Sequence, residues 1–212
     1  MGVVERKERE KEEMRQRILH AAQKLFLTKG FEKTSIRNIA DAIEYSPGTI
    51  YLYFKDKNDL LFALHQMAFE VMINELSNLG EQPTAFDGFV QMGRQYVKFA
   101  LENPEMYDLM FLMIAPIESL ECNEDLWDDG NRALDLLKMT IEACKLEGYF
   151  SKDKTDDLAL LIWSTMHGMV TIYGRRRMSM FKETDEENKE RINRAFTTFV
   201  EYLKLERWKK YS

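Results

Sequence analysis

The chain of 212 residues is poor in the residues that interrupt helices: it has 4 prolines and 10 glycines. Because proline and glycine mark turns and end helices, so few of them over this length favour an all-α protein. Cysteine is equally scarce. Cys122 and Cys144 are the only two, and no CxxC pair or nearby histidine accompanies them. This argues against a metal site and predicts two reduced thiols.

Long apolar runs and catalytic signatures are also missing. The longest apolar stretch, residues 109–117, is about half of a membrane span, and the first residues, MGVVERKEREKEEMRQR, lack the apolar core of a signal peptide. We therefore expect a cytoplasmic protein without a membrane partner. The histidines His20, His65 and His167 are far apart in sequence, and no glycine-rich phosphate loop or nucleophile–base pair stands out. The sequence predicts no enzyme, no cofactor and no metal.

The charge of the chain is unevenly distributed. The net charge is −6, but residues 1–60 carry +2 and the remainder −8. Contact with phosphates needs only a local basic surface, so an acidic chain can still bind nucleic acid. If it does, the site lies in the first third.

Apolar spacing and capping residues predict helices in this first third. We expect a helix over residues 13–29 that ends at Gly30, and a short second helix capped by Thr34. Ser46-Pro47 is typical of a helix start, with a hydroxyl cap and proline at the first helical position. Residues 50–54, however, are β-branched and aromatic, and by propensity alone they indicate a strand.

The rest of the chain follows the helical period. The predicted helices cover residues 57–79, 86–101, 126–147 and 155–177, with one more starting at Asn103-Pro104 and a last one at Thr184, where Glu187 completes a capping box. Loops are expected over residues 80–84 and 116–124.

The last two predicted helices carry more apolar surface than the core of one monomer usually requires. A homodimer built as a four-helix bundle would cover it; the alternative is that both helices are wholly intramolecular. The residues expected at the dimer contact are Leu161, Met169, Phe196, Phe199, Val200 and Leu203.

The segment TSIRNIADAIEYSPGTIYLYFKDKNDLL, residues 34–61, resembles the DNA-binding segment of TetR-type transcriptional regulators. The resemblance rests on a Thr-started helix, an Ile-Ala pair, Ser46 before Gly-Thr-x-Tyr-x-Tyr-Phe, and Lys-x-Lys-x-x-Leu-Leu, and it covers residues 15–64. It implies that residues 50–54 belong to a recognition helix instead of a strand, with Ile50 and Phe54 facing inward.

The resemblance also implies which residues contact DNA. A recognition helix places its N-terminal residues in the major groove, and its neighbours touch phosphates. No arginine stands on this helix to grip guanine, so specificity is expected to rest on few direct contacts and on DNA shape. The charged run before residue 17 is either a solvated helical extension or a flexible arm. The expected contacts are Thr34, Ser35, Arg37, Ser46, Pro47, Gly48, Thr49, Tyr51, Tyr53, Lys55 and Lys57.

Trp163, His167 and Gly168 resemble the Trp-x-x-x-His-Gly signature of a TetR subgroup with a C-terminal ligand domain, and NPEMYDLMF, residues 103–111, is similar to another part of that domain. Methionines and aromatic residues suit an adaptable apolar pocket. Taken alone, His167 on an apolar helix is by default a satisfied core histidine, and the alternative is a polar anchor in a ligand cavity. The expected ligand-binding residues are Met92, Tyr96, Phe99, Met110, Phe111, Met139, Trp163, Met166 and His167.

Together these expectations describe an all-α protein in two parts: an N-terminal three-helix helix-turn-helix domain, residues 1–56, and a larger helical ligand-binding and dimerisation domain, residues 57–212. The expected function is ligand-responsive transcriptional regulation. A repressor would bind a (pseudo)palindromic double-stranded DNA operator as a homodimer and would be released by a small apolar or aromatic molecule. The alternatives are an activator of the same family and a dimeric adaptor without a specific DNA site.

Overall fold

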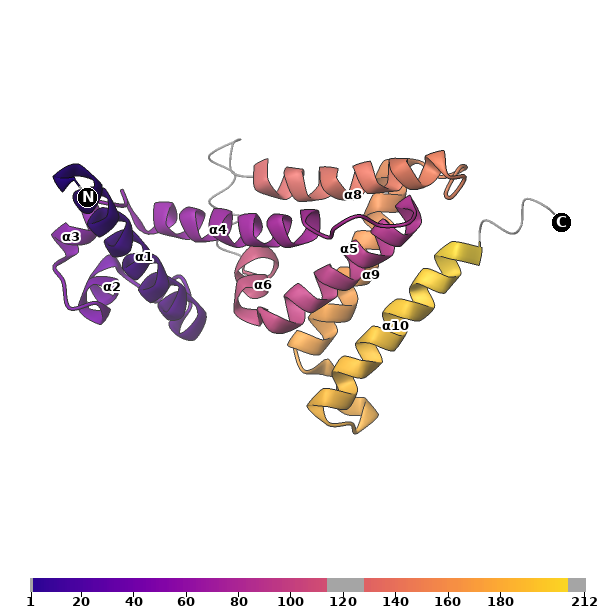
Figure 1. Cartoon of the computed structure of the whole chain (residues 1–212). Helices are drawn as coiled ribbons and strands as arrows, with labels where there is room; N and C mark the ends of the chain where they lie inside the picture. The colour runs from indigo at the N-terminus through magenta and orange to yellow at the C-terminus, as the bar shows by residue number, and fades with distance from the viewer. Residues whose placement is uncertain (1, 114–127, 206–212) are drawn as a thin grey trace. The chain divides into compact units, whose positions relative to one another are not determined.

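Within residues 2–113 and 128–205, which the computed structural model describes, every regular element is a helix (Figure 1). None of the helices in these two ranges is long and apolar enough to cross a membrane. The all-α prediction is confirmed. The loop predicted over residues 116–124, and Cys122, lie outside the described residues. The elements are α1 (Val3–Lys29), α2 (Ile36–Ala42), α3 (Pro47–Tyr51), α4 (Lys57–Ser77), α5 (Ala85–Glu102), α6 (Pro104–Phe111), α8 (Asp128–Leu146), α9 (Thr155–Gly174), the 3-10 helix η2 (Arg177–Phe181) and α10 (Asp185–Leu205).

The first helix begins well before its predicted start at residue 13. The additional turns are exposed and carry ion pairs one turn apart, such as Arg6–Glu10 at 2.7 Å and Arg9–Glu13 at 3.5 Å. Opposite charges four residues apart support a solvated helix even without an apolar face. The charged run is therefore a helical extension of α1 and not a flexible arm.

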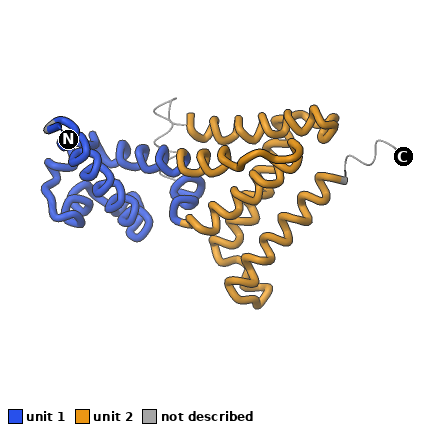
Figure 2. Tube along the Cα trace, in the orientation of Figure 1, with its two compact units in different colours: residues 1–69, 105–127 blue, residues 70–104, 128–212 orange. Residues whose placement is uncertain are grey.

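Contacts divide the chain into two compact units (Figure 2): residues 1–69 with 105–127, and residues 70–104 with 128–212. The sequence set the domain boundary at the start of α4, between residues 56 and 57. The contacts instead place the boundary between the two units inside α4, after residue 69. Leu60, Leu61 and Leu64 of α4 are buried within the first unit. α4 thus contributes residues to both units.

The first unit has a core on α1 to which the short helices α2 and α3 are attached. Ile18, Leu19 and Phe26 of α1 are almost fully buried, as the apolar spacing predicts. In the same unit α4 packs on α6: the ring of Phe69 meets that of Phe111 edge-on at 5.4 Å between centroids.

The second unit is built from α5, α8, α9 and α10, which pack on one another. Glu147, after α8, caps the beginning of α5: its carboxylate accepts hydrogen bonds from the backbone N–H groups of Ala85 (2.7 Å) and Phe86 (3.3 Å). Gly148 then turns the chain at φ 89°, a conformation that favours glycine. The ring of Tyr149 stacks on that of Phe86 at 4.3 Å. Gly148 and Tyr149 thus close α8 as predicted.

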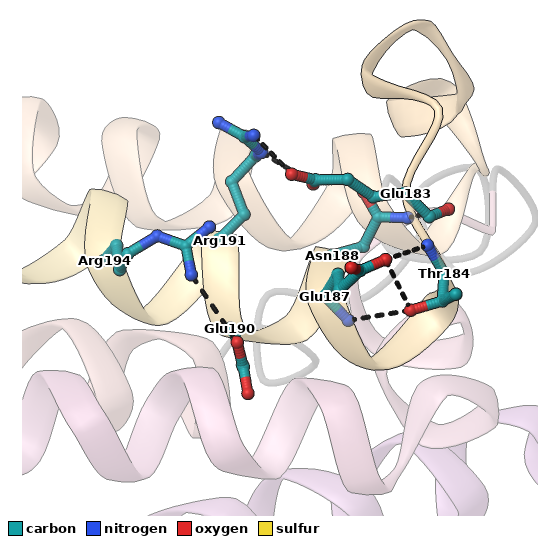
Figure 3. A network of polar contacts seen from close by, with 7 residues as sticks. All are labelled: Glu183, Thr184, Glu187, Asn188, Glu190, Arg191 and Arg194. Atoms are coloured by element: carbon teal, nitrogen blue, oxygen red, sulfur yellow. Dashed lines mark hydrogen bonds and ion pairs between the residues drawn. The ribbon is translucent and has the colours of Figure 1, made fainter.

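The start of α10 is fixed by side chains (Figure 3). Glu187 N–H donates to the Thr184 hydroxyl at 3.3 Å, and the Glu187 carboxylate accepts from Thr184 N–H at 2.7 Å. This confirms the predicted capping box. The hydrogen bond from the Thr184 backbone lowers the pKa of Glu187. One turn further, Arg191 pairs with Glu183 and also lies over the Phe181 ring, 4.2 Å from its centroid.

Phe196 was predicted at the dimer contact, and that prediction is wrong for this residue. Its side chain is 4% exposed and lies inside the second unit. Its ring packs against Gly93 of α5, where an added Cβ atom would lie only 2.8 Å from Cε2 of Phe196. α5 and α10 therefore approach each other closely at Gly93, and only glycine leaves room for the ring.

We expect Gly93→Ala to lower the free energy of unfolding by about 1–3 kcal/mol, because a rigid aromatic ring must move to accept the methyl group. Gly88→Ala on the same helix is the control. A Cβ atom there meets only Gln82, at 3.9 Å, so that substitution should be neutral or slightly stabilising. Urea unfolding of both variants is the measurement. Equal effects of the two substitutions would contradict the packing argument.

Candidate nucleic-acid interface

α2 begins with a reciprocal cap at Ser35. The Ser35 hydroxyl accepts from Asn38 N–H at 3.2 Å, and the Asn38 side-chain oxygen accepts from Ser35 N–H at 3.0 Å. Ser35 and Arg37 are exposed. The cap was predicted one residue earlier, at Thr34.

Thr34 has another role. Its side chain is buried, and its hydroxyl lies 2.8 Å from the Gly30 carbonyl oxygen and 3.2 Å from that of Leu25. A buried hydroxyl satisfied by carbonyls of α1 and its cap holds the loop before α2 in place. This geometry contradicts the prediction that the Thr34 side chain touches phosphate.

α3 is a five-residue helix, although its residues have strand propensity. The Ser46 hydroxyl accepts from Thr49 N–H at 3.3 Å, and Pro47 occupies the first turn. Ile50 and Phe54 are buried, as predicted, while Tyr51 is 57% exposed. Two burial sites and a cap outweigh the local propensity.

The exposed side of this segment offers small and polar groups. Ser46, Gly48 and Lys55 are exposed together with Tyr51, whereas Pro47, Thr49 and Tyr53 are half-buried. A small helix start flanked by hydroxyl groups and cations can approach base edges while its neighbours meet phosphates.

The turn between α2 and α3 is held by a residue that the sequence did not single out. The Arg17 guanidinium of α1 donates to the Ile43 carbonyl at 3.2 Å and lies 5.4 Å from the centroid of the Tyr45 ring. Between them Glu44 adopts φ 62°, which costs a non-glycine residue some free energy. Arg17 stands in a run of mixed charge, and its partners follow far along the chain. No local pattern could have identified it.

A second cation, Lys57, the first residue of α4, reaches the turn before α2. Its ammonium group donates to the Phe31 carbonyl at 2.9 Å and lies 4.0 Å from the centroid of the Phe31 ring. The predicted phosphate-binding lysine therefore has its ammonium group directed at its own chain.

The predicted ligand-binding residues are divided between the two units. Met110 and Phe111 belong to the first, and the other members to the second. In the second, Met92, Phe99 and Met166 are buried, whereas Met139 is 63% exposed on α8. So exposed a side chain does not line an enclosed cavity.

Trp163 and His167 lie on one side of α9, one turn apart, with ring centroids at 6.0 Å in an edge-on arrangement. His167 is half-buried, and this burial lowers its pKa below the ordinary value. Near neutral pH the ring is uncharged, so it can serve as a neutral donor and acceptor among apolar neighbours. Residues 2–113 and 128–205 contain no cluster of histidine, cysteine or acidic side chains that could hold a metal ion.

The first unit thus has the arrangement of a helix-turn-helix protein, with a second helical unit after it. Comparison with known proteins gives the family. Residues 18–64 match "Bacterial regulatory proteins, tetR family", and residues 89–197 match "Tetracyclin repressor-like, C-terminal domain". The chain belongs to the TetR family of transcriptional regulators and not to a family of enzymes. The Trp-x-x-x-His-Gly subgroup stays a prediction.

Relatives and solved structures agree with this assignment. An HTH-type transcriptional regulator of Staphylococcus aureus (strain USA300) is 27% identical over 68% of this chain and 70% of its own length. The regulator HbdR of Aromatoleum sp. (strain CIB) is 49% identical over 24% of this chain and 22% of its own. The fatty acid degradation regulator FadR from Bacillus halodurans shares the fold, with a TM-score of 0.68 at 20% identity over 86% of this chain and 93% of its own. So does a tetR-family protein from Rhodococcus RHA1, with a TM-score of 0.67 at 20% identity over 86% of this chain and 95% of its own.

The lowered pKa of His167 predicts how stability changes with pH. Because the folded pKa lies below the unfolded value, the unfolded chain takes up the proton first. Stability is therefore complete above about pH 6.5, the unfolded value, and falls as the pH drops below it. We expect His167→Gln to remove this part of the dependence between pH 7 and 5.5, measured by urea unfolding. His20→Gln, on an exposed position of α1, is the control. A wild-type slope in His167→Gln would contradict the assignment.

Proposed function

We propose that this protein is a ligand-responsive repressor that binds a (pseudo)palindromic DNA operator as a homodimer and leaves it when a small apolar or aromatic molecule binds. The carrying observation is the capped, five-residue α3, whose small exposed start lies among hydroxyl groups and cations. The TetR family membership supports the same function.

The proposed DNA contacts are those whose side chains or backbone are accessible. Thr49, at the start of α3, would meet a base edge, and Tyr51 a phosphate. The remaining members of the proposed contact set are Ser35, Arg37, Ser46, Pro47, Gly48, Tyr53 and Lys55.

The homodimer is supported by an apolar face on α9. Leu161 is 55% exposed, Ile172 is exposed on the same side of the helix, and between them a Cβ atom at Gly168 would meet nothing within 4 Å. An exposed apolar face interrupted by glycine suits the close approach of a second helix. Two copies related by a twofold axis would present their α3 helices to half-sites roughly 34–36 Å apart, or multiples of that spacing.

The effector is proposed to bind among buried methionines and aromatic rings, with His167 as a neutral polar anchor. α4 provides the connection along the chain, because its residues belong to both units. Effector binding must weaken DNA binding by the same factor by which DNA weakens effector binding. Fatty acids of increasing length are the first probes, by fold analogy with the fatty acid degradation regulator.

The DNA-binding proposal predicts that the protein enriches one palindromic duplex from a fragmented genomic pool at physiological salt. On that duplex, Lys55→Met should reduce the slope of log affinity against log salt by about 1, because one phosphate contact is lost. Tyr51→Ala should weaken binding by about tenfold at any salt concentration. Lys98→Met on α5 and Tyr202→Ala on α10, both exposed, are the matched controls. Binding without sequence preference would refute the proposal. So would control variants that weaken binding as much as Lys55→Met and Tyr51→Ala.

The dimer proposal predicts that Leu161→Glu converts the protein to a folded monomer, because an uncompensated charge would be buried at the contact. Sedimentation velocity measures the mass, and circular dichroism shows that the helices persist. Leu146→Glu is the control, since Leu146 is 92% exposed on α8. A Leu161→Glu protein that remains dimeric would place the contact elsewhere.

A further inference from the structure

The ammonium group of Lys57 has two contacts at once within the first unit. It donates to the Phe31 carbonyl oxygen at 2.9 Å and lies 4.0 Å from the centroid of the ring of the same residue. Exposed lysines usually keep the ammonium group in water and gain little from any one partner. A hydrogen bond and a cation–π contact to one residue fix the group in a single position.

The acceptor is itself held in place. The Phe31 carbonyl also accepts from Thr34 N–H at 3.1 Å, so both of its lone pairs are used. The Phe31 ring packs on that of Phe26, in the core of α1, with centroids 5.1 Å apart. Lys57 therefore binds a point that is rigidly attached to α1 and to the turn before α2.

The other end of the contact is equally fixed. At the start of α4 the Asp56 carboxylate accepts from Asp59 N–H at 2.9 Å, and the Asp59 carboxylate accepts from Lys55 N–H at 2.8 Å. A cation in the first turn of a helix opposes the helix dipole. Lys57 therefore does not stabilise α4 through the helix dipole, and the stabilisation that it provides must come from its contacts with Phe31.

Phe31 and Lys57 stand on either side of the helix-turn-helix. α2, the turn and α3 all lie between them in the sequence. The contact closes that segment into a loop by joining its two ends, which restricts how the segment can tilt on α1 and α4.

We propose that Lys57 is a positioning residue: its ammonium group ties the start of α4 to the turn before α2 and so holds the DNA-binding helices in register. This inference rests on the proposed DNA binding, but it differs from the phosphate contact that the family resemblance implies for this lysine. The contribution of Lys57 to DNA binding comes from a contact within the protein. Removing that contact therefore leaves the number of counterions released on DNA binding unchanged.

The test uses the duplex enriched by the wild-type protein, in salt titrations at a temperature where every variant is fully folded. Lys57→Met keeps the apolar stem and removes the donor and charge. Phe31→Leu keeps the charge and the carbonyl and removes the ring. Lys55→Met is the reference for a lost phosphate contact, and thermal unfolding of each variant is recorded alongside.

We expect Lys57→Met and Phe31→Leu each to weaken binding by about fivefold, with salt slopes parallel to that of the wild type. The double variant should lose little more than Lys57→Met alone, because Lys57→Met already removes the ring contact that Phe31→Leu abolishes. Lys55→Met should instead lower the slope by about 1.

Two results would overturn the inference while leaving the proposed function intact. The first is a slope lowered by about 1 in Lys57→Met together with wild-type affinity in Phe31→Leu, which defines a phosphate contact. The second is a lower unfolding temperature with unchanged affinity in both variants, which defines a purely structural role. A wild-type protein that selects no duplex would refute the proposed function itself, and the inference with it.

Discussion

The burial of Ile50 and Phe54 is the interaction on which the candidate DNA-binding surface depends. α3 has only five residues, far fewer than a helix needs for stability in water on its own. It persists because Ser46 satisfies its start and because Ile50 on the helix and Phe54, three residues after its end, are both at most 3% exposed and anchor the segment. Once these are inside, the helical period turns Tyr51 outward. The exposed chemistry of the segment is thus a consequence of what it buries.

The same dependence on distant partners extends around the helix-turn-helix. Arg17 holds the turn from α1, and Lys57 holds the preceding turn from α4. Thr34, buried in the turn between α1 and α2, has its hydroxyl satisfied by carbonyls of α1 and its cap. Three polar residues that resemble surface or DNA-contacting positions in the sequence therefore act within the unit. A regulator that reads DNA with so short a helix needs this rigidity, because a small tilt would displace every contact at the helix start.

The second unit shows how one helix can serve both a core and a surface. On α9, Leu158, Ile162 and Met166 are buried against the unit, while Leu161 and Ile172 face outward. This explains why the helix is apolar over much of its circumference. On α10 the distribution of buried residues is different. Phe196 packs inside the unit against Gly93, whereas Phe199, Val200 and Leu203 are half-buried.

Local patterns in the sequence were sufficient for the helices and several of their ends. The Thr184–Glu187 box, the Ser46-Pro47 start and the glycines after α1 and α8 act over a few residues, so neighbouring positions in the sequence are enough to identify them. The TetR-type segment was recognisable for the same reason. The charged extension of α1 was harder to delimit, because a solvated helix has no apolar face to mark it.

The sequence by itself determined the helical class, the inward positions of Ile50 and Phe54 and the family of the DNA-binding segment, because these follow from short-range spacing. Only the tertiary structure decided the roles of Thr34, Lys57, Phe196 and Met139. Each of these is a residue type suited to either surface or interior, and its choice depends on a partner, or on the lack of cover, from another helix. Lys57 finds the Phe31 carbonyl, and Phe196 finds the space left by Gly93. Such pairings join residues distant along the chain, and no local pattern contains them.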